Sequence, residues 1–150
     1  MKEWKLTFES VPEECWGYSL YHILTPADWD KVRKDAYRRA GYKCRICGAK
    51  GRLEAHEKWN YDEENRLQKL TDVLALCNKC HSVKHISRAF MVGKGEEAAA
   101  HFMAVNGCSQ MEFHEALGEA NEQHRARNKI DNWTTDISWL KENFNQLPLL

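Results

Sequence analysis

The sequence predicts an α+β fold built around a β-hairpin and a following helix that a zinc ion clamps together. The first observation is two Cys-x-x-Cys pairs, Cys44 with Cys47 and Cys77 with Cys80. The second is the pattern between the pairs, in which apolar, strand-like stretches are separated by a polar turn. Zinc takes four thiolates in a tetrahedral site, so one ion would join the loop before the hairpin to the start of the helix after it. Two disulfides or four unbound thiols are the alternatives.

Length and composition fit one small domain. The chain has 150 residues, of which 43% are hydrophobic, and it has six tryptophans, so it can bury a core that a metal ion would reinforce. We expect a single domain over residues 1–150, with a core motif at 41–90, an N-terminal flank at 1–40 and a helical C-terminal extension at 91–150.

Hydropathy and cysteine usage favour a cytoplasmic protein without a membrane partner. Residues 2–14 are too charged for a secretory signal, and no apolar run is long enough to span a membrane. In a reducing compartment, closely paired cysteines bind metal more often than they form disulfides. Cys15 and Cys108 stand alone, and we interpret both as small buried hydrophobic residues.

Short strands are expected near both ends of the chain. Residues 2–8 alternate, with Trp4 and Phe8 among the apolar residues on one side, which is typical of a strand. Residues 15–24 are aromatic and apolar without a helical period, so we expect a strand or an extended packing segment. Residues 133–140 show a similar strand-like or extended pattern.

A helix is predicted over residues 26–40. Thr25 is the expected N-cap, Pro26 occupies the first helical position, and Gly41 ends the helix. The core face of this helix would carry Trp29, Val32, Ala36 and Ala40. Its other faces expose four basic residues: Lys31, Lys34, Arg38 and Arg39.

The central hairpin is expected from two strand-like stretches on either side of a polar loop. Residues 53–59 form the first stretch and residues 61–65 the loop. Residues 66–70 begin the second stretch, with a bend or bulge near Lys69. An apolar run at 73–76 then leads into the second cysteine pair.

Helices are expected over most of the rest of the chain. The first runs from Asn78 to about residue 91, and two more cover residues 96–106 and 109–127, with Ser109 as the N-cap of the last. Three histidines of the C-terminal part lack ligand-like companions, and we interpret them as surface or core residues: His101, His114 and His124.

Charge is unevenly distributed along the chain. The whole chain carries 22 Lys and Arg against 22 Asp and Glu. Residues 31–89 hold fifteen of the basic and seven of the acidic residues, a balance of +8, which the rest of the chain offsets at −8. A basic segment of this kind indicates a polyanionic partner, and basic solvated helix faces are the alternative.

A second set of metal-binding side chains is formed by His56, Glu57, His81 and His85. His81 and His85 are four residues apart, so on a helix both imidazoles stand on one face and can bind one cation. A strand that carries His56 against this helix would complete an open site of imidazole, with or without a carboxylate. Its open positions can take water and a phosphate oxygen. The alternatives are histidines that support the zinc site, or helix surface residues.

The order of these residues resembles that of the HNH endonucleases with the ββα-metal fold and a four-cysteine zinc site. The resemblance covers about a third of the chain, residues 41–89. It rests on Cys44-x-x-Cys47, then Leu53-Glu-Ala-His56-Glu57, then Leu76-Cys77-x-x-Cys80-His81-x-x-Lys84-His85. It implies a β-hairpin and a helix that cradle a divalent ion, Mg²⁺ or Mn²⁺, and hydrolysis of a DNA phosphodiester.

The resemblance also implies roles for single residues. His81 and His85 match the helix positions that hold the catalytic ion. In one register His56 falls on a ligand position and Glu57 on the general-base position. In the other register His56 is the base and Ala55 takes the ligand position. Imidazole is the usual general base, but a carboxylate can serve, so both registers stay open.

The Asn that the family carries between these positions falls close to Asp72 here. Asp72 can accept hydrogen bonds but cannot donate them as an amide does. Asn60 is a second candidate for this role.

The sequence therefore predicts a metal-dependent endonuclease that nicks one strand of double-stranded DNA. We expect the DNA backbone to contact the basic helix through Lys31, Lys34, Arg38 and Arg39. A zinc-ribbon-like nucleic-acid-binding adaptor without catalysis is the main alternative. A structural zinc protein that contacts other proteins through its acidic C-terminal part is the third interpretation.

Overall fold

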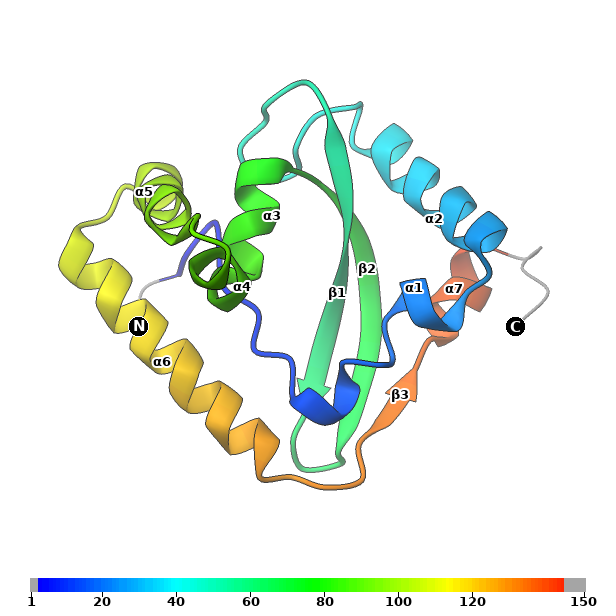
Figure 1. The fold of residues 1–150 in the computed structure, drawn as a ribbon. Coiled ribbons are helices and arrows are strands. Elements are labelled where there is room, and N and C mark those ends of the chain that lie inside the picture. The colour runs from blue at the N-terminus through cyan, green and yellow to red at the C-terminus, as the bar shows by residue number, and fades with distance from the viewer. Residues whose placement is uncertain (1–2, 145–150) are drawn as a thin grey trace.

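A long β-hairpin forms the centre of this mixed α+β protein (Figure 1). The computed structural model describes residues 3–144. The hairpin consists of β1 (Leu53–Asp62) and β2 (Leu67–Cys77), and β3 (Thr134–Asp136) pairs in parallel with the start of β2. The strand order is β1-β2-β3, so β1 is an edge strand of the sheet.

The predicted hairpin is confirmed, but its first strand extends to Asp62 and its turn is shorter than the loop expected over residues 61–65. Residues 63–66 form the turn. The Asp62 carboxylate accepts a hydrogen bond from the backbone N–H of Asn65 at 3.0 Å. The predicted bend near Lys69 lies instead at Thr71, which is skipped by the pairing of β1 with β2. The Thr71 hydroxyl donates a hydrogen bond to the Lys58 carbonyl oxygen at 3.0 Å. The side chain thus bonds a backbone acceptor where the pairing of β1 with β2 is interrupted.

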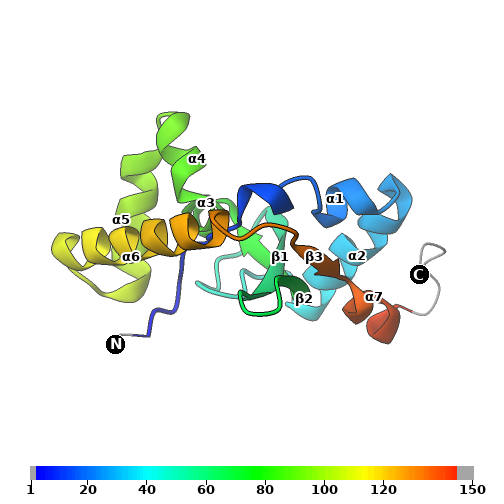
Figure 2. The same cartoon turned by 90° about the horizontal axis from the view of Figure 1, so that it is seen from below.

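Helices cover both faces of the hairpin, as Figures 1 and 2 show. One side carries α3 (Asn78–Lys84), α4 (Ile86–Met91), α5 (Gly95–Asn106) and α6 (Gln110–Asn128). The other side carries α1 (Leu20–Ile23), α2 (Pro26–Arg39) and α7 (Ser138–Asn143). Successive strand residues point to opposite faces, so Leu76 packs with Val83 and Phe102, whereas Val73 packs with Val32 and Leu140.

The helix predicted before the hairpin is confirmed as α2. The Thr25 hydroxyl accepts a hydrogen bond from the Asp28 backbone N–H at 3.2 Å, and Pro26 stands in the first turn. Val32 and Ala36 are buried against the hairpin. Gly41, with a φ of 64°, follows the helix in the left-handed conformation that glycine adopts without strain.

The strand predicted over residues 2–8 is wrong for the part that the structure describes, residues 3–8; Lys2 lies outside the described residues. The alternating apolar residues are nevertheless packed, because Leu6 is fully buried and the Phe8 ring stacks on Phe102. The side-chain amide of Asn106 bonds both the N–H and the C=O of Leu6, at 3.0 and 2.9 Å. A helix residue therefore takes the place of a neighbouring strand.

The strand or extended segment predicted over residues 15–24 is also wrong. A 3₁₀ helix (Glu13–Cys15) and the one-turn helix α1 lie there. Leu20 and Leu24 are buried four residues apart, which is the spacing of one helix face. The apolar pattern thus indicated burial, and the local conformation followed from packing against α2 and the hairpin.

The single helix predicted from Asn78 to residue 91 is broken into α3 and α4 at His85, which has φ −108° and ψ 55°. The Lys84 carbonyl accepts a hydrogen bond from the Glu9 backbone N–H at 3.0 Å. In a continuous helix this carbonyl would accept from the residue four positions further on. The N-terminal segment therefore replaces a helical hydrogen bond and turns the chain.

The remaining elements follow the prediction in part. The two C-terminal helices are confirmed as α5 and α6, and Ser109 caps α6 in a reciprocal capping box with Glu112. The pattern over 133–140 divides into the short strand β3 and the start of α7. Among residues 3–144, no helix has the length and apolar character needed to cross a membrane.

Candidate metal centres

Four cysteines meet where the loop before β1 contacts the end of β2. Cys44 and Cys47 lie on a turn in which the Gly48 N–H bonds the Cys44 carbonyl at 3.0 Å. Cys77 ends β2 and caps α3, because its sulfur accepts from the Cys80 backbone N–H at 3.4 Å. The four sulfur atoms all lie within 4.8 Å of one another. We call this group the four-cysteine cluster.

The donor set of the four-cysteine cluster is compatible with zinc. Tetrahedral zinc with Zn–S bonds of about 2.3 Å separates its sulfur ligands by about 3.8 Å, and Cys47 Sγ and Cys77 Sγ are 3.6 Å apart. Burial alone would raise the pKa of the Cys44 thiol, but backbone N–H groups, led by that of Cys47, lower it to about 7. Burial and the charges of Cys44 and Cys77 raise the pKa of Cys80. A divalent cation would offset this repulsion between thiolates.

His101 of α5 lies against the four-cysteine cluster. Its Nε2 is 3.1 Å from the sulfur of Cys80, on the adjoining helix α3. The sequence suggested no site role for this residue, because only the packing of α5 on α3 brings it close. An imidazole N–H beside a thiolate donates a charge-assisted hydrogen bond. His101 is therefore positioned to support a sulfur ligand.

Three histidines form a second cluster, as the sequence predicted. His56 lies at the middle of β1, His81 lies on α3, and His85 lies at the end of that helix. The potential ligand nitrogens all lie within 4.8 Å of one another. The ring centroids are 5.4 Å apart for His56 with each of the other two, and 5.0 Å apart for His81 and His85. We call this group the trihistidine cluster.

Carboxylates hold two of these imidazoles. His56 Nε2 is 3.0 Å from the Glu9 carboxylate, and His81 Nδ1 is 2.7 Å from the Glu54 carboxylate. A ring nitrogen that donates to a carboxylate leaves the other nitrogen as the lone-pair donor, which is the arrangement of histidines that bind metal ions. When each of these nitrogens donates its proton to the carboxylate, Nδ1 of His56 and Nε2 of His81 carry the free lone pairs. Neither carboxylate had been singled out from the sequence.

The electrostatics of the trihistidine cluster suit a cation. Burial lowers the pKa of His56, although its hydrogen bond with Glu9 opposes the shift. His85 is exposed at the surface, but partial desolvation within the cluster and the charges of His56 and His81 lower its pKa. Burial alone would raise the pKa of Glu9, but His56 and Lys84 lower it below its usual value. The lowered pKa values of His56 and His85 favour neutral rings, which can bind a divalent ion without first losing a proton.

Glu57 does not join the trihistidine cluster. It neighbours His56 on β1, and strand alternation directs its side chain away from the helix histidines, although Glu57 and His56 line one cavity along this strand. The Glu57 carboxylate accepts a hydrogen bond from the Leu20 backbone N–H. Burial raises the pKa of Glu57 to about 7, against the effect of that N–H. Of the two registers that the resemblance left open, the structure brings the imidazole and not the carboxylate to the helix histidines.

The two candidates for the family's Asn are also separate from the trihistidine cluster. Asp72 Oδ1 accepts from the Val73 backbone N–H at 2.7 Å and lies 3.4 Å from Arg39 Nη1. Asn60 is exposed on β1, opposite Lys69. Asp72 thus links β2 to the basic helix α2.

The four basic residues predicted to contact DNA lie on α2, on the other side of the hairpin from α3 (Figure 1). Lys31 is exposed there. Three others pair with carboxylates of the same helix: Lys34 with Asp30 at 2.8 Å, and Arg38 and Arg39 with Asp35 at 2.6 Å each. The structure therefore separates this basic surface from the trihistidine cluster and partly neutralises its charge.

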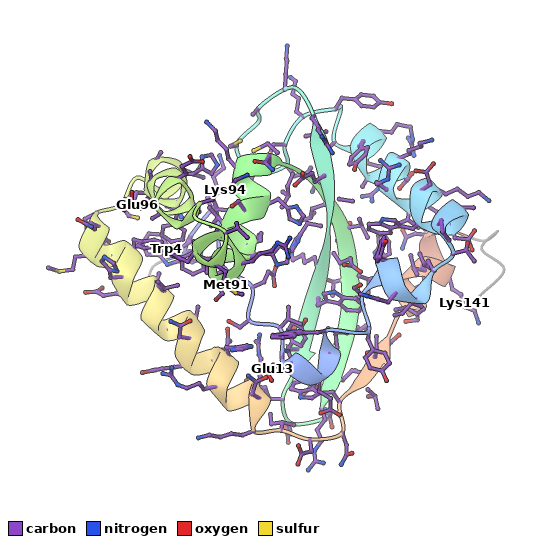
Figure 3. All side chains as sticks on the ribbon, viewed as in Figure 1. Trp4, Glu13, Met91, Lys94, Glu96 and Lys141 are labelled. Atoms are coloured by element: carbon purple, nitrogen blue, oxygen red, sulfur yellow. The ribbon has the colours of Figure 1, made fainter. Side chains whose placement is uncertain are left out.

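Other basic residues border the trihistidine cluster. A groove of about 560 Å³ runs beside α3 and α4 and is lined by His81, His85, Arg88 and Lys94. Figure 3 shows Lys94 beside α3. Arg88 lies in α4, and Lys94 follows that helix. The turn after α4 brings both side chains to one groove.

The chain matches no protein-family model, no curated protein and no solved structure in the three comparisons. The four-cysteine cluster and the trihistidine cluster are the features of the described residues that point to a function.

Proposed function

We propose that this protein is a metal-dependent endonuclease that hydrolyses phosphodiester bonds of DNA and nicks one strand. The observation that supports this most directly is the trihistidine cluster, in which two of the three imidazoles are oriented by carboxylates. It stands on a hairpin and helix that also carry two ligands of the four-cysteine cluster, Cys77 and Cys80. Because there is one such cluster among residues 3–144, it can act on one scissile phosphate at a time.

The trihistidine cluster would hold the catalytic ion. His56, His81 and His85 supply the imidazole ligands, and Glu9 and Glu54 hold two of these rings in place. A divalent cation bound there supplies Lewis acidity towards a phosphate oxygen and towards the attacking water. Mg²⁺ prefers oxygen ligands and imidazole suits transition ions better, so we expect Mn²⁺ to support nicking more strongly than Mg²⁺.

The groove beside α3 and α4 would guide the DNA backbone to this ion. Arg88 and Lys94 line it together with two of the histidines, and Lys58 is exposed on β1 two residues from His56. Arginine and lysine side chains neutralise phosphates and position the strand without reading its sequence. Lys84 is buried and instead donates to the Thr7 hydroxyl at 2.8 Å, which ties α3 to the N-terminal segment.

A plasmid-nicking assay tests the proposal. Supercoiled plasmid is incubated with the full chain and Mn²⁺ or Mg²⁺, with and without a chelator, and the open-circular product is measured. We expect His56→Ala and His81→Ala each to lower the nicking rate by at least about 100-fold, since removal of either ligand weakens the same metal site. His114→Ala is the matched control, because this exposed histidine lies on α6 outside both clusters.

Two outcomes would contradict the proposal. The first is full activity in both His56→Ala and His81→Ala after contaminating nucleases are excluded. The second is no metal-dependent nicking by folded wild-type protein that contains zinc. Salt-sensitive DNA binding without nicking would favour the zinc-ribbon-like adaptor.

A further inference from the structure

A cavity of about 390 Å³ opens from the trihistidine cluster along the outer edge of β1. The three histidines border this cavity, together with the carboxylates of Glu9 and Glu57. Its wall also carries smaller residues and four aromatic side chains: Trp16, Tyr21, Trp29 and Trp59. Its volume is in the range of pockets that hold small ligands or single groups of larger ones. A ligand seated in it would reach both the candidate metal ion and the aromatic rings.

The N-terminal segment builds the outer wall of this cavity. The segment crosses the hairpin on its way from the side of α4 to α1 (Figure 1). One end is fixed by the hydrogen bond from Glu9 to the Lys84 carbonyl, and the other by the hydrogen bond from Leu20 to Glu57 of β1. Trp16 lies between these two attachments, and Tyr21 directly follows the second one.

Two of the aromatic rings in the cavity wall are open to solvent. Trp16 is 58% exposed and Tyr21 is 73% exposed. The Trp16 indole N–H donates to the Val11 carbonyl at 3.0 Å, and its ring lies parallel to the imidazole of His124, with centroids 6.5 Å apart. Exposed large aromatic side chains gathered at one cavity are typical of binding sites.

We propose that this cavity binds an unpaired DNA base next to the phosphate that the trihistidine cluster would engage. Every base has a flat π face that stacks on aromatic side chains independently of sequence. A base paired in a duplex cannot enter such a pocket unless it is extruded. The substrate class is therefore DNA with an unpaired nucleotide: a single strand, a bulge or a frayed end. That the ligand is DNA rests on the proposed function.

Binding of fluorescent oligodeoxynucleotides tests this inference without requiring cleavage. The probes are a single strand, the same strand in a duplex, and the duplex with a one-base bulge, each titrated with the full chain in buffer without added Mg²⁺ or Mn²⁺. We expect the single strand and the bulge to bind about tenfold more tightly than the duplex. Trp16→Ala and Tyr21→Ala should each remove most of that preference, since stacking of one base contributes about this factor.

Tyr18→Ala is the matched control. Tyr18 lies between the two tested residues in the chain and is also exposed, but it does not line the cavity. We expect it to keep the preference for unpaired DNA. An equal loss in Tyr18→Ala, an equal affinity for all three probes, or no binding of any of them would overturn the inference.

The result is separable from that of the nicking assay. Nicking with no aromatic-dependent preference would reject the base-binding cavity and leave the nuclease proposal standing. A preference for unpaired DNA that depends on Trp16 and Tyr21, without any nicking, would support the cavity and reject the nuclease.

Discussion

The backbone N–H of Glu9 donates a 3.0 Å hydrogen bond to the carbonyl oxygen of Lys84. Because the Lys84 carbonyl bonds Glu9, it does not accept the hydrogen bond that would continue the helix. The helix α3 therefore ends at Lys84, and the chain turns at His85. The same contact also brings the Glu9 carboxylate to 3.0 Å from His56 Nε2. A segment far from the hairpin in sequence therefore shapes the helix that carries two of the histidines and orients the third.

Glu9 should be required for tight binding of metal by the trihistidine cluster. We expect Glu9→Ala to weaken Mn²⁺ binding about 10- to 100-fold, because loss of a carboxylate that orients a histidine ligand typically costs this much. Isothermal titration calorimetry measures the affinity. Glu13→Ala is the control, since Glu13 is an exposed acid of the same segment outside the cluster. Equal affinities of Glu9→Ala and the wild type would show that His56 is not a ligand oriented by Glu9.

One tightly held zinc ion is expected per chain, bound by the four-cysteine cluster. Cys77→Ser removes a sulfur ligand, whereas the serine hydroxyl can still cap α3. Structural zinc contributes folding free energy directly, so this variant should lose zinc and unfold its central segment. Elemental analysis and circular dichroism provide the two readouts. Cys108→Ser, a half-buried cysteine outside the cluster, should keep its zinc. Soluble, folded wild-type protein without zinc would contradict this prediction.

His101 should slow the release of that zinc ion. Its Nε2 lies 3.1 Å from Cys80 Sγ, and partners that hydrogen-bond a metal ligand typically affect metal affinity by 10-fold or more. We expect His101→Ala to release zinc to a chromogenic chelator about tenfold faster than the wild type. His114→Ala should release it at the wild-type rate. If the His101→Ala rate equals that of the control, the contact has no role in holding zinc.

Glu57→Gln tests whether Glu57 or the adjacent His56 of β1 acts as the general base. Loss of a general base lowers a rate by about 10²–10⁴-fold. Because the Glu57 carboxylate bonds the Leu20 N–H and is directed away from the helix histidines, we expect the nicking rate of Glu57→Gln to fall by less than about fivefold, far less than the loss that a general base would cause. Plasmid nicking measures both this variant and His56→Ala. A collapse of the rate in Glu57→Gln would restore the register in which the carboxylate is the base.

Salt dependence should distinguish the two basic surfaces. Replacing Arg88 and Lys94 together with Ala should weaken duplex binding for all sequences and flatten the slope of log affinity against log salt by about 2, because each phosphate contact releases about one counterion. The matched pair is Lys34→Ala with Arg38→Ala, whose charges already face Asp30 and Asp35. A larger effect from the α2 pair would place the DNA on the other side of the hairpin.

Local sequence determined the elements that depend on near neighbours. Thr25 caps α2, Ser109 caps α6, and the Cys44 turn forms, because each uses hydrogen bonds between residues a few positions apart. The spacing of His81 and His85 likewise placed both on one helical turn. Strand alternation also predicts a neighbour of His56 that residue spacing in the helix does not. Residues two apart on β1, Glu54 and His56, share a face.

Tertiary structure alone decided what completes each metal cluster. Glu9 reaches His56 and His101 reaches Cys80 across separations of 47 and 21 residues. The break at His85 and the absence of a strand over residues 3–8 have the same cause: Lys84 and Leu6 bond partners from distant segments. Residue patterns report which side chains prefer burial and which backbones can coil or extend. They do not report which distant group will satisfy a given carbonyl or imidazole, because that choice is made only when the helices pack on the hairpin.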